Sequence, residues 1–508
     1  MRTESGGSGG PIEESRAIGS RRDGRTGCGV PGLRTDFYEL TMMNGYLQAG
    51  IADRRGAFDL FVRSIPERGG YCIAAGLEAA VEFLREARFS PAEIAYLREQ
   101  ELFCEAFLER LRDFRFRGDL LAFPEGTLVF PLEPILRVQG TLFEAQFVES
   151  ALLNAINFET LIATKAARVC QEAGENNVIE FGMRRAHGVD GALSATRAAY
   201  VGGVAATSNT EAGHRLGIPV RGTQAHSWIM AFEDELSAFR AYAESYPESS
   251  ILLVDTYDTL ESGIPNAIRV GHELAQRGYR LQGIRLDSGD LAYLSIRARE
   301  MLDQADLHET KIVASGDLDE WIIHDLNVQG ARIDTWGVGT RLVTSHGEPA
   351  LTGVYKLAAI EEDGHWSPRL KIAERGTKST IPGLKQVWRL QGAQSWWEAD
   401  LIGQEDESLS VADGEWIGFH PLIEYESKRY TDIQAVEPLL VPVMRGGELV
   451  GVQPSLEEIR RRTRAQLAQL HPTSRRLLNA HIYKVSLTER TLRMRQELRR
   501  RWGAAPER

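Results

Sequence analysis

Residues 251–290, ILLVDTYDTLESGIPNAIRVGHELAQRGYRLQGIRLDSGD, contain the pattern that decides the fold. Two short apolar runs, 251–254 and 284–286, are each followed at once by an aspartate, and a helical stretch that stops at Gly278 separates them. Unbroken apolar runs are typical of strands buried on both faces, and a spacing of roughly thirty residues is that of a β-α-β unit. The segment therefore predicts two parallel strands joined by a helix over 267–277.

The same unit recurs on both sides of this stretch. The expected strands are 312–314 and 333–336 downstream and 178–181, 200–205 and 219–222 upstream, and further helices are expected over 291–305 and 318–326. Six or seven parallel strands favour an α/β barrel, with an open parallel sheet as the alternative.

Composition and pattern divide the chain into five predicted regions. Residues 1–32, rich in Gly, Ser and Arg, cannot bury enough apolar surface to offset their ordering entropy, so a disordered leader is expected there. The regions predicted after it are a mixed α+β domain over 33–140, the α/β barrel with the active site over 141–345, a β-rich region over 346–454, and a helical, Arg-rich segment over 455–508.

Local signals define several elements outside the barrel. A helix is expected from Thr35 with Asp36 as its cap, and another opens at Ser90 because Pro91 suits the first helical turn. Residues 353–360 and 386–390 are predicted to be strands. They are followed by a chain crossing at 438–442, which has a proline at each end. Residues 456–502 are predicted to form a packed helix with a solvated basic face rather than a nucleic-acid contact. Its apolar stripe would consist of Leu467, Leu470, Leu477 and Leu478.

The composition restricts the class of protein. A chain of 508 residues is too long for one ordinary core, and 43% hydrophobic with 26% charged residues is typical of a soluble globular protein. The net charge of −12 argues against a nucleic-acid binder, and no apolar run is long enough for a membrane span or a signal peptide. Four cysteines without CxxC spacing indicate neither a disulfide framework nor a zinc site. We therefore expect a cytoplasmic enzyme that contacts neither nucleic acid nor membrane.

Polar residues follow the predicted parallel strands where the strands end. Because the carboxyl ends of such strands meet on one face, these residues should converge. Asp255 and Asp287 suit ribose hydroxyls or a Mg²⁺ ion that bridges phosphates, while helix capping is the alternative for each aspartate. Which residues would ligate a metal stays open.

Glycine-rich turns follow two of the strands. Gly316 and the turn from Gly337 through Gly339 to Thr340 let backbone N–H groups approach an anion at a helix start. The sequence has no GxxxxGK[ST] loop and no complete GxGxxG, so a Walker-type NTPase and a standard dinucleotide fold are both disfavoured.

Three further residue types at strand ends could take part in chemistry. His226, in a polar loop led by Gly222, could accept a phosphoryl group or act as a base, with a purely structural role as the alternative. Arg184 and Arg285 could clamp a carboxylate or phosphate, although surface ion pairs are the alternative. Phe181 could stack on a flat heteroaromatic ring.

Seven motifs, taken in order along the chain, resemble the nicotinate phosphoribosyltransferase family. They are TDFYELTM (35–42), EFGMRR (180–185), ATSN (206–209), GTQAHS (222–227), RLDSGD (285–290), GVGT (337–340) and GVYKL (353–357). Each motif alone could arise by chance, whereas all seven in this order make the resemblance specific.

The resemblance implies a type II phosphoribosyltransferase fold, which is an irregular α/β barrel with a mixed α+β second domain formed from N-terminal and later segments. It also implies a homodimer with a shared active site. The implied reaction converts nicotinate, phosphoribosyl pyrophosphate (PRPP), ATP and water into nicotinate mononucleotide, diphosphate, ADP and phosphate. That reaction is the first step of NAD synthesis from nicotinic acid and belongs formally to the ligases, with Mg²⁺ as cofactor and ATP as co-substrate.

The resemblance also implies roles for individual residues. His226 matches the histidine that ATP phosphorylates, and Thr223 lines the same loop. Tyr38 matches a ring-stacking tyrosine supplied by the partner subunit, with Phe181 on the opposite face of the pyridine. The implied catalytic residues are His226, Arg285 and Asp287.

Other matched positions are expected to bind substrate. Arg184 and Arg285 match residues near the base and phosphate, and Asp255 fits the ribose and Mg²⁺ region. Gly316, Gly339 and Thr340 match phosphate-binding positions, and Ser315 and Gly337 are also expected to bind substrate. Thr207 and Ser208 stand where relatives that use nicotinamide carry an acidic residue, so the neutral Ser208 favours nicotinate.

Two rival interpretations remain at the level of the sequence. The first is a phosphoribosyltransferase for nicotinamide or quinolinate, and residues 254–259 even echo the acidic PRPP loop of type I enzymes. The second is a non-catalytic nucleotide-binding homologue, against which the intact His226, Arg285 and Asp287 speak.

Overall fold

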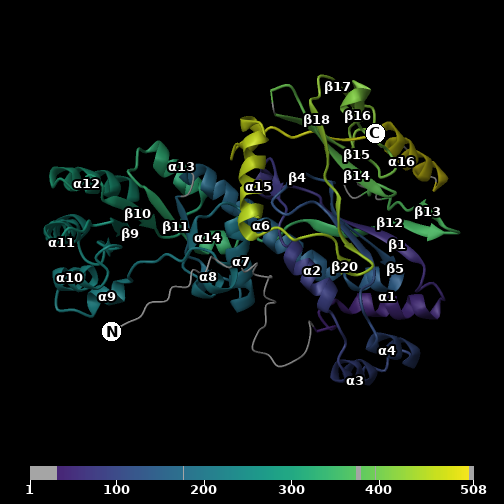
Figure 1. The fold of residues 1–508 in the computed structure, drawn as a ribbon, viewed down its shortest axis with the longest axis horizontal. Helices are drawn as coiled ribbons and strands as arrows, with labels where there is room; N and C mark the ends of the chain where they lie inside the picture. Colours follow the sequence, from purple (N-terminus) through teal and green to yellow (C-terminus); the bar gives the residue numbers. More distant parts are fainter. Residues whose placement is uncertain (1–30, 175–176, 373–378, 395, 503–508) are drawn as a thin grey trace, which may run out of the picture.

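The computed structural model describes residues 31–174, 177–372, 379–394 and 396–502. The leader predicted over 1–32 therefore falls, except for its last two residues, outside the described part of the chain. Figure 1 shows an α/β unit on one side and β-rich sheets on the other, with the long helix α6 (Glu149–Ala173) between them.

The α/β unit is built on a sheet of six parallel strands. In sheet order they are β7 (Ala206–Thr207), β6 (Val178–Glu180), β11 (Thr335–Val338), β10 (Lys311–Ser315), β9 (Gly283–Leu286) and β8 (Ile251–Leu253). Helices α10 (Glu235–Ser245), α11 (Ile264–Gln276), α12 (Leu291–Gln304) and α13 (Glu320–Val328) cover it. The strands and helices predicted from residue 251 to residue 336 are thus confirmed within a few residues.

The barrel is closed irregularly at one seam. Val220 forms an isolated parallel bridge with Thr207 of the edge strand β7, so the sheet continues past β7 by a single residue. Between that segment and β8 no strand pairing is present among the described residues, and the side chain of Gln224 spans the gap by donating to the carbonyl of Ile251 at 3.1 Å. A side chain thus replaces the missing ladder at this point.

Two of the predicted barrel strands are wrong. Residues 200–205 were expected to be extended, but α7 (Val189–Val201) runs into this segment and β7 begins only at Ala206. Alanine-rich sequence favours the helix, and a side chain at Gly202 would meet the carbonyl of Ala163 in α6 at 2.3 Å, so the two helices pack closely. Residues 219–222 make only the bridge at Val220 because Pro219 has no N–H for a ladder.

The mixed domain is centred on a seven-stranded antiparallel sheet. Its order is β13 (His365–Pro368), β12 (Gly353–Glu362), β1 (Arg55–Val62), β5 (Pro134–Thr141), β3 (Asp119–Ala122), β19 (Val441–Arg445) and β20 (Glu448–Leu449). Leu60 in β1 pairs with Tyr355 on one side and Leu136 on the other, so segments nearly three hundred residues apart share one sheet. Early and late parts of the chain therefore form this domain together.

Short helices pack against that sheet. They are α1 (Phe37–Gln48), α2 (Leu77–Glu86), α3 (Pro91–Glu99), α4 (Glu105–Arg112) and α5 (Leu142–Phe147). Ser90 and Glu93 form a reciprocal capping box at the start of α3, as the Ser-Pro signal predicts. Asp36 does occupy the cap position of α1, but it makes no cap hydrogen bond and instead accepts one from Ser150.

A third, six-stranded sheet follows the mixed domain. Its order is β17 (Ser427–Tyr430), β16 (Trp416–Phe419), β21 (Val485–Leu487), β15 (Trp397–Gln404), β14 (Lys385–Gln391) and β18 (Ala435–Pro438). The crossing expected at 438–442 is the point where the chain leaves β18 for β19 in the other sheet.

The helix predicted over 456–502 is wrong in its middle. It is divided into α15 (Leu456–Gln469) and α16 (Glu489–Arg501), with β21 between them as an inner strand. Proline at 472 cannot continue a helix, and Leu478 lies exposed outside both helices. The basic face is only partly solvated, because Arg460, Arg495 and Arg499 are buried. No helix in the described residues is long and apolar enough to span a membrane.

Candidate active site

Arg285, at the end of β9, is the hub of a polar cluster at the carboxyl ends of the barrel strands. Its Nε donates to Ser315 Oγ at 2.8 Å and its Nη2 donates to Asp287 Oδ1 at 2.6 Å. Its Nη1 reaches the 223–226 loop, donating to Thr223 Oγ1 at 3.0 Å and to the Gln224 carbonyl at 3.2 Å. One guanidinium thus joins the end of β10, the residue after β9 and the 223–226 loop. Its planar fork fixes the relative positions of these three segments.

Asp287 connects this hub to the neighbouring strand. Besides Arg285, its Oδ1 accepts a short hydrogen bond from the Ser315 hydroxyl. Burial acts to raise the pKa of the Asp287 carboxyl, but the bond from Ser315 and the charge of Arg285 outweigh burial and hold the pKa below its ordinary value. The carboxylate is therefore ionised throughout the neutral range.

Asp255, at the end of β8, lies beside Asp287. Its Oδ2 accepts hydrogen bonds of 2.8 Å from the backbone N–H of Asp287 and from Ser288 Oγ. Its Oδ1 is buried and has no hydrogen-bond partner in the structure. A buried carboxylate oxygen without a partner is costly, so this atom is suited to a hydroxyl or cation that a ligand brings.

His226 is the first residue of α9 (His226–Met230) and faces the same cluster. Its Nδ1 lies 3.2 Å from Thr256 Oγ1, and its Nε2 lies 3.7 Å from Asp287 Oδ2. The imidazole side chain is 40% exposed, so one ring nitrogen can meet a ligand from the mouth of the barrel.

Phe181 forms the apolar side of the mouth. It follows β6 directly, and the Arg285 guanidinium carbon lies 5.6 Å from the centre of its ring. A side chain at Gly337 would meet the Phe181 ring at 2.6 Å, so only glycine allows β11 to pass behind it. The ring therefore offers a flat, half-buried surface next to a cation.

Gly316 and Gly339 allow the turns after β10 and β11 to lie close to the backbone at the ends of neighbouring strands. Gly316 has φ +98°, and a side chain there would meet the carbonyl of Asp287 at 2.2 Å. Gly339 caps α14 (Thr340–Val343), and a side chain there would lie 3.0 Å from the Phe181 carbonyl. Both glycines thus bring the turns after β10 and β11 close to Asp287 and Phe181.

Several predicted residues do not join this cluster. Thr207 is buried, and its hydroxyl donates to Glu180 Oε2 at 2.6 Å, so it supports the mouth from inside. Ser208 follows it and is only half-buried. Arg184 is exposed in the turn after Phe181. Tyr38 is 44% exposed and belongs to α1, a helix that lies with the mixed domain on the other side of α6 from the barrel in Figure 1.

Two other aspartates near the site, Asp258 and Asp290, serve as helix caps, the role that was the alternative for Asp255 and Asp287. Asp258 accepts from the backbone N–H groups of Leu260 and Glu261, and Asp290 accepts from that of Tyr293. Asp255 and Asp287 make no such bonds and face the cluster instead.

Sequence reasoning missed three residues of the cluster. Thr256 contacts His226, Ser288 contacts Asp255, and Gln224 closes the barrel seam. Thr256 and Ser288 each follow a strand-end aspartate directly, and this position is the signal that could have identified them. Gln224 carries no such signal, since its role depends on which strands fail to pair.

Sequence comparison accounts for most of the chain. Residues 33–157, 177–368 and 384–495 match, in that order, the N-terminal domain, the family core and the C-terminal domain of nicotinate phosphoribosyltransferase (NAPRTase). The nicotinate phosphoribosyltransferase of Bacillus subtilis is 45% identical over 458 residues, which is 90% of this chain and 93% of that protein. Nicotinate phosphoribosyltransferase 2 of Arabidopsis thaliana is 37% identical over 544 residues, covering 94% and 96% of the two chains.

The chain belongs to the nicotinate phosphoribosyltransferase family. The crystal structure of human nicotinic acid phosphoribosyltransferase superposes with a TM-score of 0.80 at 32% identity, covering 91% of this chain and 99% of that one. The predicted fold class, an irregular α/β barrel of the type II phosphoribosyltransferase kind with a mixed α+β second domain formed from N-terminal and later segments, is thereby confirmed.

Proposed function

We propose that this family member transfers the phosphoribosyl group of PRPP to nicotinate, forming nicotinate mononucleotide and diphosphate. This reaction opens the route from nicotinic acid to NAD. The observation that carries the proposal is the convergence of Phe181, His226, Arg285, Asp287 and Ser315 at one end of the barrel. Relatives whose names specify this activity, at up to 45% identity, support it.

The transfer step needs positioning and charge more than proton movement. The pyridine nitrogen of nicotinate carries no proton, so its lone pair forms the bond to the anomeric carbon while the bond from that carbon to the diphosphate oxygen breaks. Positive charge builds on the ribose as the diphosphate leaves with the electron pair. The ionised Asp287, with Asp255 beside it, stabilises that charge, and Arg285 faces the anionic partners.

Phe181 would bind one face of the pyridine ring. We propose that the enzyme works as a cytoplasmic homodimer in which the partner subunit's Tyr38 stacks on the other face. The exposure of Tyr38 on α1, away from the barrel of its own chain, supports this arrangement. A neutral Ser208 rather than a carboxylate beside the mouth favours the nicotinate anion over nicotinamide.

ATP would be used through His226. A proton on Nδ1, donated to Thr256, leaves the lone pair of Nε2 for attack on the γ-phosphorus of ATP, with ADP as the leaving group. Water later takes the phosphoryl group from the histidine, so ATP is cleaved to ADP and phosphate in each cycle. This cleavage would place the enzyme formally among the ligases, without any Walker loop.

Magnesium would bind at this site together with PRPP. Among the described residues no group of three or more His, Cys, Asp or Glu side chains is arranged to hold a metal by itself. Asp255 does offer a buried oxygen without a partner, and substrate phosphates could supply the remaining ligands. When bound, Mg²⁺ would neutralise the charge of the departing diphosphate.

Product analysis tests the proposal directly. The parent chain is incubated with PRPP, Mg²⁺ and either nicotinate, nicotinamide or quinolinate, with and without ATP. We expect nicotinate mononucleotide as the product, with more of it in the presence of ATP. A preference for another base would establish a rival substrate, and absence of transfer with all three would favour a nucleotide-binding homologue.

The same assay on His226→Ala separates the two chemical steps. We expect this variant to lose ATP cleavage and to retain weak, ATP-independent transfer, because the base and ribose contacts stay in place. ATP cleavage at the parent rate would contradict the role given to His226.

A further inference from the structure

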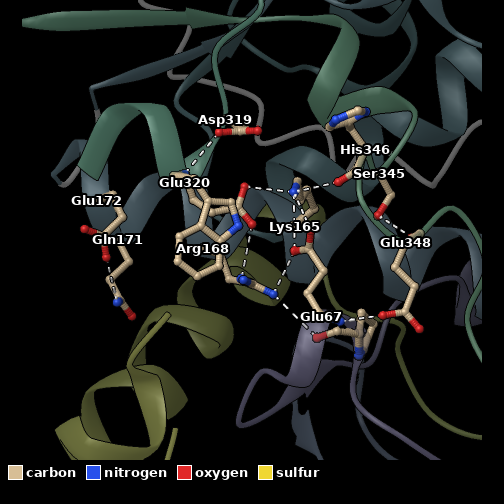
Figure 2. Close-up of polar contacts among 12 residues, drawn as sticks. Glu67, Lys165, Arg168, Gln171, Glu172, Asp319, Glu320, Ser345, His346 and Glu348 are labelled. Atoms are coloured by element: carbon tan, nitrogen blue, oxygen red, sulfur yellow. Dashed lines mark hydrogen bonds and ion pairs between the residues drawn. The ribbon is translucent and has the colours of Figure 1, made fainter. Parts of the chain in front are cut away.

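Four charged side chains from three segments meet in a buried network behind the barrel mouth (Figure 2). They are Glu67 from the turn Pro66–Arg68, Lys165 and Arg168 from α6, and Glu320 from the start of α13. Lys165 Nζ lies 2.9 Å from Glu320 Oε2 and 3.3 Å from Glu67 Oε1. Arg168 lies 3.2 Å from Glu320 through Nε and 2.9 Å from Glu67 through Nη1. We call this set the α6 network.

The α6 network is almost free of solvent. The exposed fractions of the side chains are 0% for Glu320, 3% for Lys165, 6% for Arg168 and 17% for Glu67. Two cations face two anions, so the charges balance. Buried ion pairs of this kind give little net stability compared with apolar packing, because desolvation offsets most of the attraction. Their benefit therefore lies in fixing geometry.

The geometry that the network fixes is that of two loops at the mouth. Glu320 follows Asp319, which caps α13 and accepts a 2.6 Å bond from Arg341. Arg341 in turn follows Thr340, one of the expected phosphate-binding residues. Lys165 also donates to the carbonyl of His346 at 2.9 Å. The turn after β10, with Gly316, and the segment after β11 that runs from Gly339 through α14 to His346 are thus held from behind by α6.

Backbone strain accompanies these contacts. Glu67, Asp317 and Ser345 have φ values of 50°, 47° and 45°, a left-handed conformation that non-glycine residues seldom adopt. A side chain at Gly347 would meet Glu67 Oε1 at 2.0 Å, so this loop packs its backbone directly on the network. Strained residues of this kind persist only where surrounding contacts determine them.

We propose that Lys165 and Arg168 are positioning residues for PRPP, holding the loops after β10 and β11 in the shape that receives its phosphates. They touch no substrate themselves. The proposal rests on the proposed function to the extent that these loops bind phosphate. It assigns to α6 and to the mixed-domain residue Glu67 a role in substrate affinity that is separate from the chemistry at Arg285 and His226.

The test compares Lys165→Met with Lys385→Met. Lys385 is an equally buried lysine, 3% exposed, paired with Asp59 at 2.6 Å in the mixed domain away from the mouth. Both changes should lower the unfolding temperature. Only Lys165→Met should raise the KM for PRPP, by about tenfold, with the KM for nicotinate unchanged, because sub-ångström loop shifts affect phosphate positioning first.

Calorimetric titration of each folded variant with PRPP and Mg²⁺ gives a second readout that needs no turnover. The Kd should rise in Lys165→Met and stay at the parent value in Lys385→Met. An unchanged PRPP KM and Kd in Lys165→Met, or equal rises in both variants, would overturn the proposal. A parent that binds PRPP but transfers it to another base refutes the proposed substrate and leaves this test intact.

A milder variant covers the case in which Lys165→Met does not fold. Glu67→Gln keeps the shape of the side chain, removes one charge and alters the most exposed member of the α6 network. We expect a rise of about threefold in the PRPP KM and Kd. Parent values for both constants in a folded Glu67→Gln would overturn the proposal.

Discussion

Arg285 shows how much of the site depends on the shape of one side chain. Its guanidinium donates to two hydroxyls, a carbonyl and a carboxylate, which come from the 223–226 loop, β10 and the residue after β9. A lysine would keep the charge, but its single nitrogen cannot reach partners in such different directions. Charge and shape can therefore be separated by substitution at this position.

We expect Arg285→Lys to lower kcat/KM for PRPP by about 10²- to 10³-fold, the size usual for removing a preorganised donor. Steady-state kinetics with PRPP varied provide the measurement. Arg240→Lys is the matched control, because Arg240 forms a fork with Glu273 on the exposed side of α10. Similar losses in both variants would show that the shape of the fork at Arg285 has no special role.

Two glycines at the mouth are required for different physical reasons. Gly316→Ala places a methyl group 2.2 Å from the Asp287 carbonyl in a positive-φ backbone, and Gly337→Ala places one 2.6 Å from the Phe181 ring. We expect Gly316→Ala to impair PRPP use and Gly337→Ala to impair nicotinate use, each by at least about tenfold in kcat/KM.

Gly191→Ala in α7 serves as the control for both. Nothing lies within 4 Å of the added atom and φ is ordinary, so we expect unchanged kinetics and a gain of about 0.5–1 kcal/mol in the free energy of unfolding. If Gly316→Ala and Gly337→Ala impair both substrates alike, the separate roles assigned to the two turns are wrong.

At the scale of elements, the junction of α1 and α6 carries a carboxyl group with an unusual pKa. Glu39 accepts hydrogen bonds from the Ser150 N–H and hydroxyl at 2.7 and 2.6 Å, which join the two helices. Burial raises the pKa of Glu39 to about 7 despite these bonds, and the nearby Glu149 and Asp36 add to the rise. Tyr38 is the residue before Glu39 on α1, so this junction also sets the position of the Tyr38 ring.

We expect Glu39→Gln to change how stability depends on pH. A carboxyl that holds its proton more tightly in the folded chain stabilises the fold below the unfolded pKa near 4.5, and this stabilisation is lost as pH rises toward 7. The loss is at most about 3.5 kcal/mol, since the pKa rises from 4.5 to about 7 and one pKa unit corresponds to about 1.4 kcal/mol. Chemical unfolding at pH 5 and pH 8 measures it, and the glutamine variant should lack this component. A parallel pH dependence in both proteins would contradict the assignment.

At the scale of the whole molecule, the site should be complete only in a dimer. His226, Arg285 and Phe181 come from one barrel, whereas Tyr38 lies in the mixed domain beyond α6. In the dimer that we propose, the stacking tyrosine comes from a second copy, and each dimer holds two such composite sites.

Mixing two variants, each expected to lack ATP-dependent transfer, tests this arrangement. Tyr38→Ala and His226→Ala damage different contributors to each site, so a mixed dimer keeps one undamaged site. Co-refolding equal amounts should restore about a quarter of the parent's ATP-dependent transfer, because half of the dimers are mixed and each has one good site. Mixing His226→Ala with Arg285→Lys should restore nothing, since both residues belong to the same barrel. No recovery in the first mixture would exclude sharing of Tyr38.

The parallel barrel strands and the residues at their ends could be predicted from local sequence. An apolar run that ends in Asp255, Asp287 or Ser315 indicates a strand, its length and its polar end, and all three signals lie within a few consecutive residues. Parallel strands must present their polar ends on one face. This is why the cluster around Arg285 could be expected. The short-range signal failed at 200–205, where alanine-rich sequence packs on α6 as a helix, and in the stretch around β21, where an inner strand interrupts a helical pattern.

The sheet pairing of distant segments and the partners of the buried charges became visible only in the folded chain. The pairing of β1 with β12 and the insertion of β21 beside β15 join segments far apart in the chain. The same holds for the meeting of Glu67, Lys165 and Glu320, whose charges look in the sequence like ordinary surface residues. The physical reason is that sequence patterns report local periodicity, whereas burial of a charge is settled by partners that the folded chain brings from hundreds of residues away.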